Sequence, residues 1–404
     1  MTGDAYSRRN VLGMAASGGM AALVAGCVQL ERGTAVPLGQ TTHATVLGVP
    51  NERFFPTDGT GPLTAEVYAA IGRQQRLLGL APDKLPPQMQ ILAVSGGGEN
   101  GAFGAGLLCG WTETGSRPVF ELVTGVSTGA LTAPFAFLGS AYDAQLRAVY
   151  TELAPADVLV TRGLVAGALF HDAMADNTPL YKTISRYLTP DMQAALAKAY
   201  GEGRLLHIGT SDLDAQLPVV WNIGAIAASG HPRALDTIRR VLLASAAIPG
   251  AFPPTMFDVT LDGVAYQEMH VDGGAFAQAF LYPASLTQGR RERMKQGKPV
   301  IDIEAYIIRN ARLDPDWATV NRSTFGIAER AINTMIATSG YNDVVRIYFT
   351  TLQDGVGYHL AYIGEDFTMK LPEPFDPGYM RALFDYGYQQ ARHGYDWKSK
   401  PPGY

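Results

Sequence analysis

The chain is poor in cysteine, in basic clusters and in long apolar runs, and each shortage excludes a class of protein. Two cysteines in 404 residues are too few for the disulfide framework of a small secreted domain. The net charge of -5, from 32 basic and 37 acidic residues without a basic face, argues against a nucleic-acid partner. Beyond the first 26 residues, no segment has the roughly 20 uninterrupted apolar residues of a membrane-spanning helix. With 47% hydrophobic residues, the chain is globular and able to bury a sizeable core.

The first residues have the pattern of an export signal. Arg8 and Arg9 precede a modestly apolar stretch, and small residues lead up to Cys27. The segment SRRNVL resembles a twin-arginine signal, and VAGC, ending at Cys27, resembles a bacterial lipoprotein cleavage box. Together they predict that residues 1–26 are a signal peptide and that a lipid on Cys27 tethers the protein to a membrane. The expected location is the bacterial cell envelope, on the periplasmic face of the inner or outer membrane. The alternative is a buried Gly/Ala-rich helix with a chance cysteine.

Short β-type segments alternate with helical ones along the body of the chain. MQILAVS and VFELVTG are each followed by glycines and a helical pattern, which is the rhythm of a buried parallel sheet. We therefore predict an α/β fold, a three-layer sandwich with a mainly parallel central sheet. The predicted divisions are the signal peptide 1–26, a tether 27–62, an amphipathic helix and linker 63–90, a catalytic domain 91–286, and a C-terminal α/β extension 287–404 packed on the same domain.

The remaining elements follow from hydrophobic period and from capping signals. Further strands are expected at 205–213, 217–223, 266–274, 300–308 and 345–352. Helices are expected at 101–114, 128–138, 142–153, 190–200, 235–246, 325–338 and 377–393. The last of them has Asp376 as its N-cap, Pro377 at its first position and Gly394 beyond its end.

A serine flanked by glycines follows the second of these strands. Gly125, Ser127 and Gly129 form a G-x-S-x-G sequence between a strand and a helical pattern, which is the context of a nucleophile elbow. The small neighbours permit a sharp turn that exposes the Ser127 hydroxyl, and the helix that begins there directs its positive dipole end towards the serine. Ser127 is therefore the candidate nucleophile.

A serine nucleophile needs a base, and the chain offers two candidates. One is His359, which follows Asp354 closely and would complete a Ser, Asp, His order. The other is Asp272, which ends a β-type run and is followed by Gly273 and Gly274. A carboxylate accepts the proton directly if burial raises its pKa towards the operating pH. Asp272 alone is also typical of a turn, so the residues by themselves leave both bases open.

A glycine cluster follows the first core strand. Gly96, Gly98 and Gly101 have the G-x-G-x-x-G spacing of a dinucleotide site, but Glu121 lies near the start of the next strand, not at its end, where a ribose-binding acid is expected. Gly96, Gly97 and Gly98 are consecutive, and the exposed amides of such a run can form an anion nest. That nest suits the oxyanion of ester hydrolysis.

The order of these parts resembles the patatin-like phospholipase family. SGGGENGAFGAG, GVSTG, ASAAIPGAFPP and DGG occur in the family's order between about residues 91 and 284. The resemblance implies a dyad of Ser127 and Asp272 without histidine, and a lipid carboxylic ester as substrate of a phospholipase A or lipase type. It implies no cofactor and no metal, and it leaves the oligomeric state open. It also implies an oxyanion loop made by Gly96, Gly97, Gly98 and Gly101.

Two positions depart from that family pattern. Asn100 stands where the family often has Arg or Lys, and Gln278 and Phe280 stand where it commonly has Asn and Pro. The alternative function is therefore a non-catalytic envelope lipoprotein that uses the same fold for lipid binding or interaction.

Overall fold

The computed structural model describes residues 31–161, 173 and 175–404. The predicted signal peptide and Cys27 lie outside the described residues. Among the described helices, none combines the length and the apolar character that crossing a bilayer requires.

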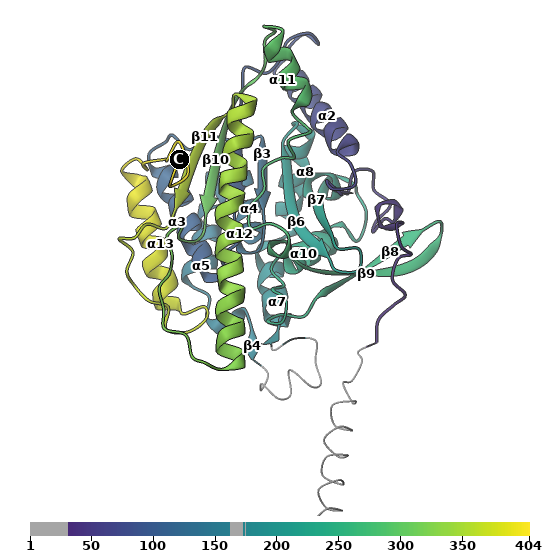
Figure 1. Ribbon diagram of the computed structural model, residues 1–404. Helices are drawn as coiled ribbons and strands as arrows, with labels where there is room; N and C mark the ends of the chain where they lie inside the picture. The colour runs from purple at the N-terminus through teal and green to yellow at the C-terminus, as the bar shows by residue number, and fades with distance from the viewer. Residues whose placement is uncertain (1–30, 162–172, 174) are drawn as a thin grey trace, which may run out of the picture.

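The core of the molecule is a nine-stranded sheet in the order β1-β7-β6-β3-β2-β10-β11, with the β8–β9 hairpin attached to β6 (Figure 1). The strands β6, β3, β2, β10 and β11 are parallel neighbours, whereas β1, β7 and β9 pair antiparallel. The strands are β1 (Arg53–Phe54), β2 (Gln88–Val94), β3 (Leu122–Gly125), β6 (Leu205–Asp212), β7 (Leu217–Asn222), β8 (Thr255–Leu261), β9 (Val264–Asp272), β10 (Asp302–Arg309) and β11 (Gly357–Tyr362). Two short strands, β4 (Val160–Thr161) and β5 (Ala175–Asp176), form a separate pair.

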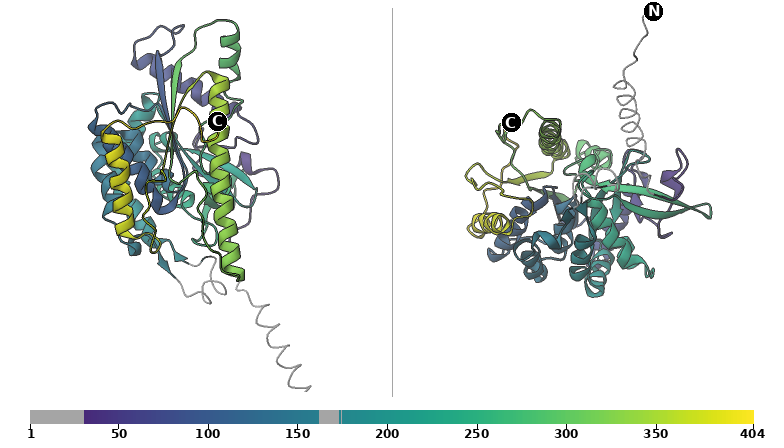
Figure 2. Two further views of the ribbon diagram at one scale, coloured as in Figure 1. Left: turned by 60° about the vertical axis from the view of Figure 1, so that its left-hand side comes forward. Right: turned by 90° about the horizontal axis from the view of Figure 1, so that it is seen from below.

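Helices cover both faces of this sheet. One face, here called the α4 face, carries α3 (Gly101–Glu113), α4 (Thr128–Leu138), α5 (Asp143–Thr151), α7 (Thr178–Tyr187), α8 (Pro190–Gly201), α9 (Ile223–Ala228), α10 (Ala234–Ser245) and α13 (Pro377–Arg392). The other, here called the α12 face, carries α2 (Gly61–Leu77), α11 (Gln288–Lys295) and α12 (Thr324–Asp354). Figure 2 shows α13 and α12 on opposite sides of the sheet.

The alternation of side chains along β2 shows why both faces must be covered. Leu92 and Val94 belong to the core under α4, while Ile91 and Ala93 belong to the core on the α12 side. Successive residues of a strand point to opposite faces, so a strand that is apolar at every position is stable only between two layers. The predicted three-layer α/β sandwich with a mainly parallel sheet is confirmed.

One predicted strand is wrong. Residues 345–352 form the second half of α12, which continues from Thr324 to Asp354 instead of ending at 338. The β-branched and aromatic residues of this segment suggested a strand. Val344, Ile347 and Thr351 are buried at a spacing of three and four residues, so packing of one helical face on the sheet overrides the local preference.

The final helix was predicted correctly. Its N-cap, Asp376, accepts a hydrogen bond from the Tyr379 amide at 2.7 Å, and the helix runs from Pro377 to Arg392. It packs along α3, where added Cβ atoms at Gly106 and Gly110 would lie 2.0 and 2.3 Å from backbone oxygens of α13. The glycines of α3 therefore set the close approach of the two helices.

Candidate active site

Ser127 lies at a strained turn between β3 and α4. Its backbone angles are φ 56° and ψ −129°, a region that costs a non-glycine residue of the order of 1–3 kcal/mol. Neighbouring glycines make the turn possible, because a Cβ atom at Gly129 would lie 2.2 Å from the Val94 carbonyl oxygen and one at Gly125 would lie 2.6 Å from that of Gly129. The geometry is that of the nucleophile elbow which the sequence predicted.

A second serine, Ser245, fixes this turn from behind. The Ser127 amide donates a hydrogen bond to Ser245 Oγ at 3.0 Å, and the Ser245 hydroxyl donates to the Gly209 carbonyl oxygen at 2.7 Å. Ser245 ends α10, is fully buried, and lies within the ASAAIPGAFPP block of the sequence. That block is part of the family resemblance, but nothing in the sequence indicates that its serine contacts Ser127.

Asp272 ends β9 and lies beside the serine. Its carboxylate accepts hydrogen bonds from the Ser127 hydroxyl and from the Gly274 amide, the latter at 2.7 Å. Burial raises the pKa of Asp272 to about 7, against the lowering effect of these two hydrogen bonds. The carboxyl group is therefore close to half ionised at neutral pH and is poised to accept a proton.

Glycines at 273 and 274 allow the chain to turn immediately after Asp272. A Cβ atom at Gly273 would lie 2.5 Å from the Gly209 carbonyl oxygen, and one at Gly274 would lie 2.8 Å from Gln278 Nε2. The Gln278 side chain donates to the Gly274 carbonyl oxygen at 2.9 Å, and the Gln278 backbone carbonyl oxygen accepts from the Gly96 amide at 3.0 Å. Gln278 thus links the Asp272 turn to the glycine loop.

The glycine loop passes directly beside the serine. A Cβ atom at Gly96 would lie 3.8 Å from Ser127 Oγ, and one at Gly97 would lie 2.1 Å from the Asn310 carbonyl oxygen. Gly98 has a φ of +57°, which favours glycine. Among the described residues, the Gly97 and Gly98 amides have no hydrogen-bond acceptor. They are the donors that remain free for an oxyanion.

Two of the four glycines predicted to form the oxyanion hole are therefore reassigned. The Gly96 amide is bonded to Gln278, and the Gly101 amide is bonded to the Gly98 and Glu99 carbonyl oxygens. Gly101 is needed for space, since a Cβ atom there would lie 2.1 Å from Thr128 Oγ1. The sequence predicts that this loop is the oxyanion hole, but it does not show which of the amides already donate hydrogen bonds within the protein.

The end of β10 supports the loop with two buried side chains. Asn310 donates through its amide groups to Ser95 at 2.9 Å, and its Oδ1 accepts from the Gly104 amide at 3.0 Å. Arg309, only 2% exposed, donates to the Gly96 carbonyl oxygen at 3.2 Å. Burial lowers the pKa of Arg309 to about 10, so it stays charged at neutral pH. Sequence reasoning missed both residues.

Arg309 supplies near the glycine loop the positive charge that Asn100 lacks. Asn100 Oδ1 accepts a hydrogen bond from the Tyr379 hydroxyl of α13 at 2.7 Å. The Asn100 side chain therefore holds the last helix against the loop. A positive charge is still present behind the glycine loop, supplied by Arg309 from β10. The chain thus combines a neutral residue within the loop with a buried cation beneath it.

An apolar cavity of about 80 Å³ opens next to Ser127 on the α4 face. Its wall includes Leu131, Phe135, Leu180 and Ile184. The cavity is bounded by the nucleophile at one end and by aliphatic and aromatic side chains elsewhere, which is the environment that an acyl chain requires.

The alternative base is not assembled. His359 Nε2 bonds to the Glu304 carboxylate at 2.6 Å and its ring stacks on Tyr306. Asp354 instead forms an ion pair with Arg291 at 2.7 Å. Because His359 and Asp354 engage different partners, and neither is bonded to Ser127 among the described contacts, the Ser, Asp, His arrangement is not supported.

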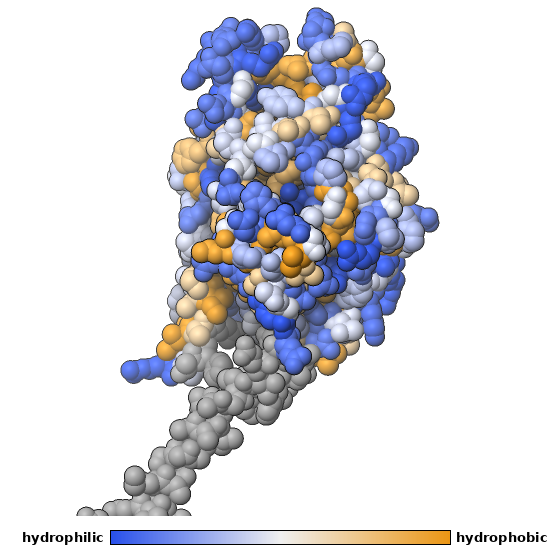
Figure 3. Space-filling model, turned by 90° about the vertical axis from the view of Figure 1, so that its right-hand side faces the viewer, coloured by the Kyte–Doolittle hydropathy of each residue, from blue (hydrophilic) through white to orange (hydrophobic). Residues whose placement is uncertain are grey.

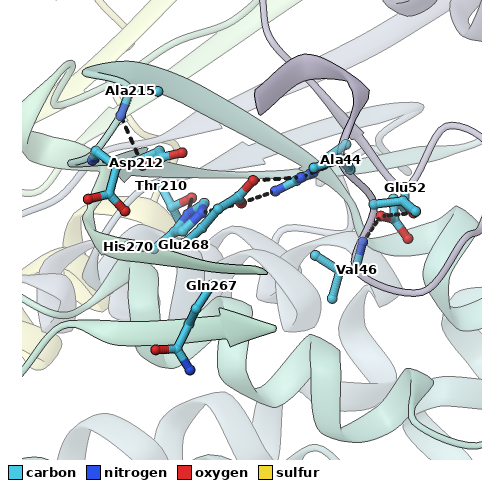
Figure 4. A network of polar contacts seen from close by, with 12 residues as sticks. Ala44, Val46, Glu52, Thr210, Asp212, Ala215, Gln267, Glu268 and His270 are labelled. Atoms are coloured by element: carbon cyan, nitrogen blue, oxygen red, sulfur yellow. Dashed lines mark hydrogen bonds and ion pairs between the residues drawn. The ribbon is translucent and has the colours of Figure 1, made fainter. Parts of the chain in front are cut away.

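A second buried polar cluster lies just before Asp272 on β9 (Figure 4). The ligating atoms of Asp212, Glu268 and His270 lie within 4.8 Å of one another. Arg53 donates to both Glu268 carboxylate oxygens, at 2.5 and 3.0 Å, and His270 bonds to the same carboxylate at 3.1 Å. Burial alone would raise the pKa of Glu268, but these partners lower it to about 2. The Arg53 guanidinium lies against Glu268, where a metal ion would otherwise balance the negative charge of the cluster. The cluster thereby joins β1 to the β8–β9 hairpin.

The fold and the site together place a serine at a strained turn beside a buried carboxyl group, within a mixed α/β sandwich. Residues 92–284 match the family model of patatin-like phospholipase, and this part of the chain is a patatin-like phospholipase domain. A solved structure, that of VipD from Legionella pneumophila, is similar to the chain with a TM-score of 0.36 and 11% identity, over 77% of this chain and 68% of that one. No curated protein matches the chain in sequence. The family assignment implies a lipid acyl hydrolase.

Proposed function

We propose that the protein hydrolyses lipid carboxylic esters through a dyad of Ser127 and Asp272. The observation that carries the proposal is the hydrogen bond between the Ser127 hydroxyl and a buried carboxyl group whose pKa burial raises to about 7. Asp272 removes the hydroxyl proton while Ser127 Oγ attacks the ester carbonyl carbon. The oxyanion formed in this step accepts hydrogen bonds from the Gly97 and Gly98 amides.

The second half of the reaction reuses the same groups. The proton held by Asp272 passes to the departing alkoxide, which leaves the acyl group on Ser127. Asp272 then takes a proton from a water molecule that attacks the acyl carbon, and the proton returns to Ser127 as the acid is released. Charge on the oxyanion is further stabilised by Arg309 beneath the loop, which supplies the positive charge that Asn100 does not.

The apolar cavity beside Ser127 supports an acyl chain as the bound part of the substrate. Its lining is mostly aliphatic and aromatic, with the polar side chains of Glu99, Ser127, Thr128 and Thr183 among them, so it favours an aliphatic chain over a sugar or a peptide. A phospholipid or another long-chain ester satisfies this requirement, and the alcohol part would leave towards solvent.

We further propose that the enzyme works at a membrane surface, tethered through a lipid on Cys27 in a bacterial cell envelope. The motif VAGC supports the tether. The first half of α12 supports the surface contact, because Ile327, Ile332, Met335 and Ile336 are exposed along one side of it. This half lies at the carboxyl edge of the parallel strands, since α12 ends just before β11 begins. Ser127 follows β3 at that same edge.

The experiment is a lipid hydrolysis panel with three variants. Ser127→Ala and Asp272→Asn should abolish release of fatty acid from phospholipid and triacylglycerol vesicles, while His359→Ala should retain it. A folded protein without activity on any ester, or one whose activity survives in Ser127→Ala, would favour the non-catalytic lipid-binding alternative. Loss of activity in His359→Ala with retention in Asp272→Asn would replace the dyad with a histidine base.

A further inference from the structure

A second and larger cavity lies on the α12 face of the sheet. Its volume is about 610 Å³, within the range of small-molecule sites. The floor is the sheet, including Leu122 and Leu205, and the walls come from α2 with Val67 and Ile71 and from the segment around Phe280. On the side of the molecule that Figure 3 shows, apolar residues reach the surface in separate areas between hydrophilic ones.

This cavity is long and follows the strands. Along β6 its lining extends from Leu205 to Thr210, which corresponds to roughly 16 Å at about 3.3 Å per residue. Its wall is apolar along this length, with few polar groups. The lining also crosses the sheet from β7 to β10, so this largely apolar trough has room for an unbranched alkyl chain, whereas a polar ligand would lose its hydrogen bonds to water there.

The deep part of the cavity carries no positive charge. His207 lines it, is 3% exposed, and has no hydrogen-bond partner for Nε2 among the described residues. Burial lowers the pKa of His207 to about 4, so its ring is neutral at physiological pH. A charged head group bound beside it would lose its hydration without gaining a counter-charge.

The mouth of the cavity differs, because α11 brings two guanidinium groups to it. Arg293 donates through Nε and Nη2 to the Pro299 carbonyl oxygen, at 3.1 and 2.8 Å. Arg290 donates to backbone carbonyl oxygens. Among the ion pairs of the described residues, neither arginine has a carboxylate partner. The lining therefore has a neutral imidazole at His207 and two guanidinium groups where α11 contributes to it, and it also includes Glu121 and the Asp343–Arg346 ion pair.

We propose that this cavity binds one long-chain fatty acid, with the alkyl chain along the sheet and the carboxylate at Arg293. The apolar trough accounts for binding of the alkyl chain. The contrast between the neutral His207 and the cationic Arg293 accounts for the direction in which the fatty acid lies. This cavity and the one at Ser127 lie mainly on opposite faces of the sheet, and they approach each other where Val126 and Gly273, the chain neighbours of Ser127 and Asp272, line the larger one. Binding here requires no catalysis and holds whether or not Ser127 is a nucleophile.

The test is direct binding of palmitic acid to the full chain carrying Ser127→Ala, measured by displacement of a fluorescent fatty acid. Val67→Trp and Ile71→Trp fill the trough and should each weaken binding by about tenfold or more. Ala69→Trp, on the outer side of the same helix, should leave the affinity unchanged. Thermal unfolding of each variant separates a filled cavity from a misfolded protein.

Charge and chain length give two further readouts. Arg293→Gln should weaken palmitate binding by about threefold while leaving hexadecanol unaffected, because only the acid carries the charge. Affinity should rise by about tenfold for every two methylenes and then level off once the trough is full. Leu131→Trp narrows the cavity at Ser127 and should not change the affinity.

Two results would overturn the proposal. Equal affinity in folded Val67→Trp, Ile71→Trp and Ala69→Trp would show that the trough is not the site. Loss of binding in Leu131→Trp alone would place the fatty acid beside Ser127, as a product of the proposed reaction and not as a ligand of a second site.

Discussion

The two faces of the central sheet are filled in different ways. On the α4 face, tightly packed helices leave only about 80 Å³ beside Ser127, and the Ser127 turn and the start of the glycine loop are held by hydrogen bonds from the distant residues Ser245 and Asn310. On the α12 face, three helices leave about 610 Å³ unfilled, and the lining there is mostly apolar, with a few ionisable side chains that include Glu121, Arg293 and the Asp343–Arg346 ion pair. Close packing on one face gives the precise geometry that chemistry needs, while the loosely covered face offers volume without a reactive group.

Removing the nucleophile should have the largest effect and should show that only the α4 face carries the catalytic site. Ser127→Ala should lower ester hydrolysis by at least about 10⁴-fold, since a serine enzyme without its nucleophile retains only binding and oxyanion stabilisation. Val67→Trp, on the other face, should change the rate of a short-chain ester by less than about twofold. The measurement is kcat/KM on a soluble ester. A comparable loss in both variants would show that the two faces are not functionally distinct.

Replacing the base should have the next largest effect. Asp272→Asn should reduce hydrolysis by about 10³-fold, because the amide cannot accept the serine proton. In the unmodified protein, kcat/KM should rise with pH through about 7, the pKa to which burial raises Asp272, and then level off. A rate that does not depend on pH between 5.5 and 8.5 would contradict the assignment of Asp272 as the base.

Ionisation of Asp272 should also make the free energy of unfolding depend on pH. Because the pKa of Asp272 is raised in the folded state to about 7, ionisation destabilises the fold increasingly between about pH 4 and pH 7 and by a constant amount above that. Asp272→Asn should therefore raise the free energy of unfolding by up to about 4 kcal/mol at pH 8 and by little at pH 4. Denaturant unfolding at both pH values checks this. Asp385→Asn, at an exposed position, is the control. An equal increase in its free energy of unfolding would contradict the assignment of the effect to the ionisation of Asp272.

The smallest expected effect concerns the exposed half of α12. Met335→Glu should weaken partitioning onto phospholipid vesicles by about tenfold, since a charge replaces an apolar side chain at the proposed membrane contact. Ala337→Glu adds the same charge on the other side of the helix and should have little effect. Vesicle flotation of the chain lacking residues 1–30 isolates this contact from the tether. Equal weakening by both variants would point to net charge and not to this surface.

How far the site could be predicted depended on how local each part is. Ser127, Asp272 and the glycine loop are recognisable because their geometry is set by adjacent glycines. Ser245 and Asn310 could not be found in this way, since Ser245 bonds to Ser127 from 118 residues away and Asn310 bonds to Ser95, just before the loop, from 215 residues away. The missing charge at Asn100 is local and could be seen in the sequence. The positive charge of Arg309 comes from a distant strand, so the sequence did not reveal it.

The fold shows the same division between local and distant information. Alternating strands and helices predicted the three layers, but residues 345–352 have the composition of a strand and become helical because one of their faces packs on the sheet. The cavity on the α12 face had no counterpart in the sequence, because an unfilled volume is a property of how separate helices are spaced and not of any one segment.

The central claim is that Asp272 activates Ser127, and the rate of covalent labelling by a fluorophosphonate tests it most directly. We expect an adduct on the peptide that contains Ser127, formed at a rate that rises with pH through about 7, and slowed by about 10³-fold in Asp272→Asn but not in His359→Ala. An adduct on another serine, or labelling of Ser127 at an unchanged rate in Asp272→Asn, would contradict it.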